Sequence, residues 1–169
     1  MSDNKIIQKP DYSDYNLDFE KQKVCDFLLK SNLSLSENFL DAIEFGDIIE
    51  IYSFPENIQI YSNDEFKKLC SYTPEQMISM PFPNLFWRDP DIHAGLMKRA
   101  AEVCQMDKGA YVWGIPRHEL IENLHPRKRT FEIVVKKIAP CFKAQESLAS
   151  AFISTLQVEF IFEWNKDIG

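Results

Sequence analysis

Glycine is scarce in this sequence, with five in 169 residues, and none of them stands in a phosphate-binding loop of the GxGxxG or GxxxxGK type. The GxSxG turn that presents a catalytic serine is missing from the sequence as well. We therefore expect neither a nucleotide-binding loop of these kinds nor a serine hydrolase.

Cysteine is also scarce, and its spacing excludes the common zinc patterns. The four cysteines lie far apart without a CxxC pair, and the three histidines are equally scattered. The N-terminus has no apolar signal segment, and no stretch approaches the ~18 consecutive apolar residues of a membrane helix. We expect a cytoplasmic protein with reduced thiols, no metal site and no membrane partner.

Basic residues are in the minority, with 19 Lys and Arg against 26 Asp and Glu, for a net charge of −7. Because a surface of this sign repels phosphate backbones, we expect no direct nucleic-acid partner. Apolar residues are plentiful at 45% of the chain, including 13 Phe, 6 Tyr and 3 Trp. This composition is typical of a globular chain that builds its own core.

The N-terminal part predicts an arm followed by helices. Residues 1–16 are polar and suggest a flexible arm, while residues 17–30 and 34–45 carry apolar side chains at helical spacing. Gly46 suits a helix end because glycine adopts the left-handed conformation at low cost. We assign residues 1–46 to the arm and a helical flank, whose apolar faces we expect to form a homodimer.

In the rest of the chain, the spacing of apolar residues alternates between that of strands and that of helices. We expect strands at 47–52, 57–61, 110–115, 129–138 and 151–164, the last with Leu156, Val158, Phe160, Phe162 and Trp164 on one face. Short helices are expected after residue 63 and from residue 73, where TPEQ forms a capping box, and the longest helix at 89–106. The segment 80–83 (MPFP) predicts a loop, and 117–128 a loop or short helix.

Residues 63–77 read NDEFKKLCSYTPEQM, which resembles the pattern NxxFxxLxGYTxEEL of the PAS domain family. The order of expected strands and helices is similar too. The resemblance implies an α+β fold over residues 47–165, with a five-stranded antiparallel sheet, helices on one face, and N-terminal amphipathic helices before it. Ser71 stands where the family prefers glycine, so a positive φ there would be strained.

The resemblance also carries the functional expectation. The chain is similar to the N-terminal PAS domain of some helix-turn-helix regulators, which implies a sensory and signalling module, and the sensor part of a transcriptional regulator. Such a module binds a small ligand or mediates dimerisation and protein–protein contacts. Aromatic and apolar residues around the long helix could wall a ligand pocket, or they could simply fill the core. These candidates are Phe66, Phe86, Trp87, Met97, Tyr111, Trp113 and Phe131.

Three polar residues leave a catalytic alternative open, and the cofactor remains unknown. Haem-binding relatives use a histidine of the central helix, a role that would suit His93, although we favour the simpler interpretation of a lone histidine at the helix surface. An enzyme could instead use His118 and Glu119, or His93, in a cleft between sheet and helix. Because neighbouring strand residues point to opposite faces and no nucleophile accompanies the pair, we expect no enzyme.

Overall fold

The computed structural model describes residues 4–124 and 129–165. The helices in these ranges are α1 (Leu17–Lys30), α2 (Glu37–Asp41), α3 (Asp64–Leu69), α4 (Pro74–Ser79), α5 (Phe82–Leu85) and α6 (Pro90–Val103). The strands are β1 (Asn4–Gln8), β2 (Leu33–Ser34), β3 (Ile48–Ser53), β4 (Gln59–Ser62), β5 (Phe86–Trp87), β6 (Val112–Trp113), β7 (His118–Glu122), β8 (Arg129–Lys143) and β9 (Ala151–Asn165).

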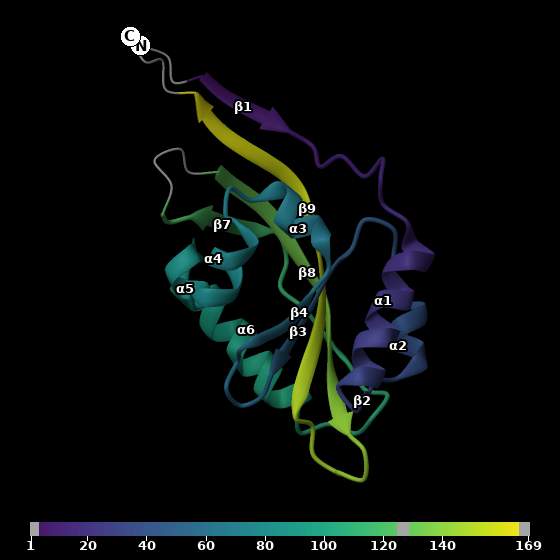
Figure 1. Ribbon diagram of the computed structural model, residues 1–169. Coiled ribbons are helices and arrows are strands. Elements are labelled where there is room, and N and C mark those ends of the chain that lie inside the picture. The colour runs from purple at the N-terminus through teal and green to yellow at the C-terminus, as the bar shows by residue number, and fades with distance from the viewer. Residues whose placement is uncertain (1–3, 125–128, 166–169) are drawn as a thin grey trace.

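All these strands belong to one antiparallel sheet whose main order is β4-β3-β9-β8-β7-β5. The long hairpin of β8 and β9 forms its centre, β1 extends along the end of β9, and β2 and β6 pair with β8 (Figure 1). The fold is therefore α+β with a large antiparallel sheet. The sheet carries more strands than the five that the sequence predicts.

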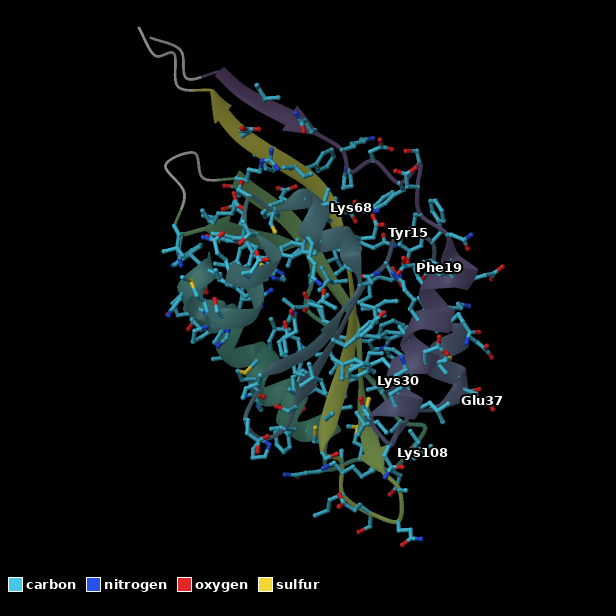
Figure 2. The ribbon with its side chains drawn as sticks, in the orientation of Figure 1. Tyr15, Phe19, Lys30, Glu37, Lys68 and Lys108 are labelled. Carbon is cyan, nitrogen blue, oxygen red and sulfur yellow. The ribbon has the colours of Figure 1, made fainter. Side chains whose placement is uncertain are left out.

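Helices lie on both faces of the sheet, those of residues 47–165 on the inner face and those of the N-terminal flank on the outer face (Figure 1). On the inner face, α3 and α6 pack on β3, β7, β8 and β9 around a core that includes Phe66, Leu96, Phe131 and Leu156. On the outer face, α1 and α2 cover β3, β8 and β9 and form a second core that has Val24 and Ile153 at its centre. In Figure 2, side chains fill the space between α1 and the sheet.

The helical flank is predicted well in α1 and less well in α2. Helix α1 has the expected bounds, and its first turn is capped by Asn16, whose Oδ1 accepts a hydrogen bond from the Phe19 amide at 3.0 Å. Helix α2 is one short turn rather than a helix over 34–45. Gly46 has a φ of +87°, as its type suggests, but it lies in a turn beyond α2 instead of at a helix end.

The expected flexible arm is structured where the chain is described. Residues 4–8 form β1, which pairs with residues 161–165 of β9, and residues 1–3 lie outside the described part. Tyr15, at the start of α1 on its sheet side (Figure 2), donates a hydrogen bond to the Asp47 carbonyl at 2.9 Å. Tyr12 packs edge-on against Tyr15 and Phe45. Aromatic side chains thus anchor a segment whose polar composition suggested flexibility.

The helical segment between β4 and α6 follows the prediction closely. Thr73 and Gln76 form the expected capping box at the start of α4, with side-chain-to-backbone distances of 3.3 and 2.9 Å. Ser71 does not adopt a positive φ; its amide and hydroxyl donate to the buried carboxylate of Glu122 at 2.6 and 2.8 Å. The MPFP segment is not entirely a loop, because α5 begins at Phe82.

Two expectations about the C-terminal strands are wrong. Residues 118–122 form β7 rather than a loop or short helix, and residues 125–128 lie outside the described residues. In β9, the register against β8 shifts where Glu132 pairs with Phe160 and Ile133 with Val158, so Glu159 is an extra residue. After this bulge Ile161 joins the inner core, and Phe160 instead lies beneath the cations of Lys9 and Arg117. The alternation that puts Leu156 through Phe162 on one face therefore ends at the bulge.

None of the helices in residues 4–124 and 129–165 is long and apolar enough to cross a membrane.

Candidate functional site

A cavity of about 590 Å³ lies between the inner face of the sheet and the helical layer formed by α3 to α6. Its floor is formed by β3, β7, β8 and β9 of the sheet, and α6 lies opposite them. Exposed residues of the β3–β4 turn and of the segment from α4 to α5, among them Asn57 and Pro81, line its opening. This volume is in the range of cavities that hold metabolite-sized ligands.

Most of the cavity lining is apolar. The floor side chains alternate with residues of the outer core because successive strand residues point to opposite faces. On the opposite wall, Leu96 and Met97 of α6 face the sheet. The apolar lining comprises Ile58, Phe66, Met77, Met80, Pro81, Pro83, Leu85, Leu96, Met97, Leu120, Ile133, Val135, Ile138, Phe152 and Leu156.

A polar group interrupts this lining on β3 and β4. Ile49 and Ile51 face the outer core. Because successive strand residues point to opposite faces, Glu50 and Tyr52 face the cavity. The Tyr52 hydroxyl donates to Glu50 Oε2 at 2.8 Å, and Gln59 Nε2 donates to the Tyr52 oxygen at 3.2 Å. Burial raises the pKa of the Glu50 carboxyl and raises the pKa of Tyr52 well above its ordinary value.

Arg88 completes the polar group from the segment between β5 and α6. It lines the cavity half-buried. Burial lowers the pKa of its guanidinium, while the nearby Tyr52 and Glu50 act in the opposite direction. The charge of Arg88 in turn lowers the pKa of Glu50, against the larger effect of burial. The cavity thus holds one acidic and one basic group within electrostatic reach of each other.

The two histidines singled out in the sequence lie close to this group. His93 lines the cavity from the first turn of α6, and burial together with the charge of Arg88 lowers its pKa. His118 is 7% exposed on the inner face of β7, opposite Ile133 in register. Its Nδ1 donates to the Pro116 carbonyl at 2.9 Å, since a carbonyl can only accept. The same two causes lower its pKa, burial being the larger.

The seven residues predicted to bind a ligand are separated by the fold. Phe66 and Met97 line the cavity. Phe86 and Phe131 are fully buried behind Phe66, with ring centroids at 5.3 and 5.4 Å from it. The other three are on the surface: Trp87 and Tyr111 are each 44% exposed and Trp113 is 64% exposed, outside the cavity.

Sequence reasoning missed Glu50, Tyr52, Gln59 and Arg88, although one signal for them is present. The segment Asp47–Tyr52 reads DIIEIY, in which a glutamate stands between isoleucines of a strand covered on both faces. A charged residue inside such a strand has to face a polar site, because leaving it unpaired in the core would be costly. Arg88 lies next to the exposed Trp87, and nothing in its local sequence marks it as a cavity residue.

The side chains of His118 and Glu119, considered for catalysis as a pair, do not point to the same site. His118 faces the inner side of β7, whereas Glu119 is exposed on the opposite side. Within the residues that the structure describes, no three His, Cys, Asp or Glu side chains come close enough to share a metal ion.

Neither the models of known protein families nor the curated proteins contain a match to this sequence.

Proposed function

We propose that this protein is a PAS-like sensory module that binds a small molecule in the cavity between the sheet and α6. The observation that supports the proposal best is the cavity itself. It has the volume of a metabolite site, a mostly apolar lining and a smaller set of polar groups that includes Glu50, Tyr52 and Arg88. A ligand that fills it would bridge the β3–β4 hairpin and α6, and could change the relative stability of two arrangements of these elements.

The segment 63–77 supports the family part of this proposal. Phe66 is buried at the cavity wall, and the capping box at Thr73 starts α4, which carries Met77 into the lining. A role as the sensor part of a transcriptional regulator and a cytoplasmic location also belong to the proposal. They rest on the sequence resemblance and composition.

Dimerisation through the N-terminal helices is the second expected activity, and the observed packing gives it less support. The apolar side chains of α1 and α2 that would contact a partner, among them Val24, Leu28 and Phe39, pack on the protein's own sheet. On α1, Phe19 and Leu29 remain exposed, at 58% and 81%. We therefore put ligand binding first.

The test is whether filling the cavity removes binding. The purified protein is first examined by native mass spectrometry and visible absorption for a retained ligand. Binding of the neutral fluorophore N-phenyl-1-naphthylamine is then measured for wild type, for Leu96→Trp, which places an indole in the cavity, and for Leu148→Trp. Leu148 is 70% exposed in the β8–β9 turn and is the matched control.

We expect wild type and Leu148→Trp to bind the fluorophore alike, and Leu96→Trp to bind it at least about tenfold more weakly, a loss of about 1.4 kcal/mol. Met97→Trp, on the same wall but only half-buried, replaces Leu96→Trp should that variant not fold. Absence of fluorophore binding by wild type, or equal binding by the cavity-filling variants, would overturn the proposal.

A further inference from the structure

Four of the polar residues that line the cavity form one patch, and most of the remaining lining is apolar. Tyr52 and Gln59 are directly paired across β3 and β4, and Glu50 and Tyr52 are hydrogen-bonded on the same face of β3. Arg88 is within electrostatic reach of both Glu50 and Tyr52. The patch, defined as Glu50, Tyr52, Gln59 and Arg88, is therefore the part of the lining that can orient a ligand through hydrogen bonds.

The net charge of the patch is zero when Glu50 is ionised. The patch contains one carboxylate and one guanidinium within electrostatic reach of each other, and Tyr52 and Gln59 add no charge. The remaining ionisable lining groups are His93, whose pKa is lowered so that its ring favours the neutral form, and Glu56, which is exposed at the opening. An anionic or cationic head group bound at the patch would leave one buried charge without a counter-charge, and such a charge is strongly destabilising.

The hydrogen-bonding capacity of the patch is equally balanced. The Arg88 guanidinium can only donate, the Glu50 carboxylate can only accept, and Tyr52 and Gln59 can do both. A head group that both donates and accepts can satisfy each side of the patch at once. A site built in this way discriminates against analogues that lack one of the two functions, because its own buried polar groups are then left unpaired.

We infer that the cavity selects an uncharged amphipathic molecule that carries a carboxamide- or hydroxyl-type head at the Glu50–Arg88 patch. Its alkyl or aromatic body would lie over Leu96, Ile133 and Leu156. This inference rests on the proposed function, since it names the class of ligand that the same cavity binds.

The experiment uses three probes that share one alkyl chain and differ in head group: decanamide, decanoate and decylammonium. Each competes with bound N-phenyl-1-naphthylamine on the full chain, at mildly alkaline pH, which favours the ionised form of Glu50. Wild type is compared with Glu50→Gln, which leaves the patch positive, and with Arg88→Gln, which leaves it negative. Glu119→Gln is the matched control, because Glu119 is exposed on the opposite face of the sheet.

We expect wild type and Glu119→Gln to bind decanamide at least about tenfold more tightly than either ion. Glu50→Gln should shift the preference to decanoate and Arg88→Gln to decylammonium, each by a similar factor. Should Arg88→Gln not fold, the inference is tested by Glu50→Gln alone, through the expected change of preference towards decanoate.

The outcomes separate this inference from the proposed function. The inference would be overturned if wild type bound the three probes equally or preferred one of the ions. It would also be overturned if Glu50→Gln kept the wild-type order of affinities for the probes. In each case fluorophore binding would still uphold the cavity as a binding site. Displacement by none of the probes would also overturn the inference. Failure of wild type to bind the fluorophore itself would overturn both.

Discussion

His118 places the two nitrogens of its ring in different surroundings. Its Nδ1 is held by the Pro116 carbonyl, while its Nε2 is enclosed without a hydrogen-bond partner. A proton added to Nε2 would be a buried donor with no acceptor, close to the positive charge of Arg88. The ring is therefore stabilised in its neutral form by its position in β7.

This position predicts a pH dependence of stability. The unfolded chain protonates His118 near its ordinary pKa of 6.5, whereas the folded chain does so only at lower pH. The free energy of unfolding should therefore fall as pH decreases from neutral through 6.5 towards the lowered pKa. His93 acts in the same direction and Glu50 in the opposite one, so the effect of His118 is obtained by difference.

Urea denaturation over this pH range, for wild type and His118→Gln, measures that difference. The variant should lose less stability on acidification than wild type, because the group that takes up the proton in the unfolded state is gone. Since His93 and Glu50 are present in both proteins, their contributions cancel. If the free energies of unfolding of the two proteins changed in parallel with pH, His118 would have the same pKa in the folded and the unfolded state.

At the scale of elements, the close approach of β6 to β8 shapes one wall of the cavity. The Gly114 amide donates to the Lys136 carbonyl at 2.9 Å, and the Val135 amide donates to the Ile115 carbonyl at 3.1 Å. A Cβ atom at position 114 would lie 1.9 Å from the Val135 carbonyl oxygen. The absence of a side chain at Gly114 therefore lets this segment reach β8 behind Val135, which lines the cavity.

Two glycine-to-alanine substitutions should have opposite effects. Gly114→Ala places its methyl group against backbone and should destabilise the protein by about 1–3 kcal/mol or more. Gly95→Ala, in α6, meets its nearest atom, Ile115 Cδ1, at 3.7 Å. It should stabilise the protein by about 0.5–1 kcal/mol, because alanine favours the helix. Chemical denaturation measures both, and a neutral Gly114→Ala would contradict the close approach.

At the scale of the whole molecule, the sheet separates two apolar cores. The inner core contains the cavity, and the outer core is closed by α1 and α2. Because both cores lie within one chain, we expect the outer helices to contribute to the stability of the monomer. Neighbouring residues of α1 allow a direct test, since Leu28 is 5% exposed and Leu29 is 81% exposed.

Leu28→Ala should cost about 2–5 kcal/mol, as expected for a buried leucine, because it leaves a space in the outer core. Leu29→Ala should change stability by less than about 0.5 kcal/mol, because its side chain is in solvent. Unfolding is measured at several protein concentrations together with light scattering. A concentration-dependent loss of stability in Leu29→Ala would instead indicate that α1 contacts a second copy.

The sequence predicts most of the helices and four of the main strands because their signals are local. Helix α1 follows from periodic apolar residues, and the start of α4 from the pair Thr73 and Gln76. Asn63 precedes the first residue of α3, where the sequence predicts a helix to begin. Its side chain does not cap the helix but accepts from the Ile49 amide at 3.1 Å and donates to the Asp47 carbonyl at 3.0 Å. Its partners are distant in sequence, so its role depends on the fold.

The parts that the sequence does not predict depend on contacts across the sheet. Strand β7 directs His118 and Glu122 inward, and the polar sequence of this strand therefore gives no sign that one of its faces is buried. Glu122 is satisfied there by Ser71, which is remote in sequence, and by the Arg129 amide of β8 at 3.0 Å. The bulge at Glu159 likewise depends on the register with β8. Of the seven residues predicted to bind a ligand, Phe66 and Met97 line the cavity, as does His93, the candidate of the alternative interpretations. The other five do not, because aromatic content marks a core as readily as a binding site.

The alternation of β3 has a mechanical consequence. Glu50 and Tyr52 touch the cavity, and Ile49 and Ile51, joined to them by single peptide units, touch the helices on the other side of the sheet. A ligand in the proposed site that displaced Glu50 or Tyr52 would act on the backbone of β3, which is held between β4 and β9 and carries Ile49 and Ile51 on its other face. The cavity and the outer core under α1 are thus separated by the thickness of a single strand.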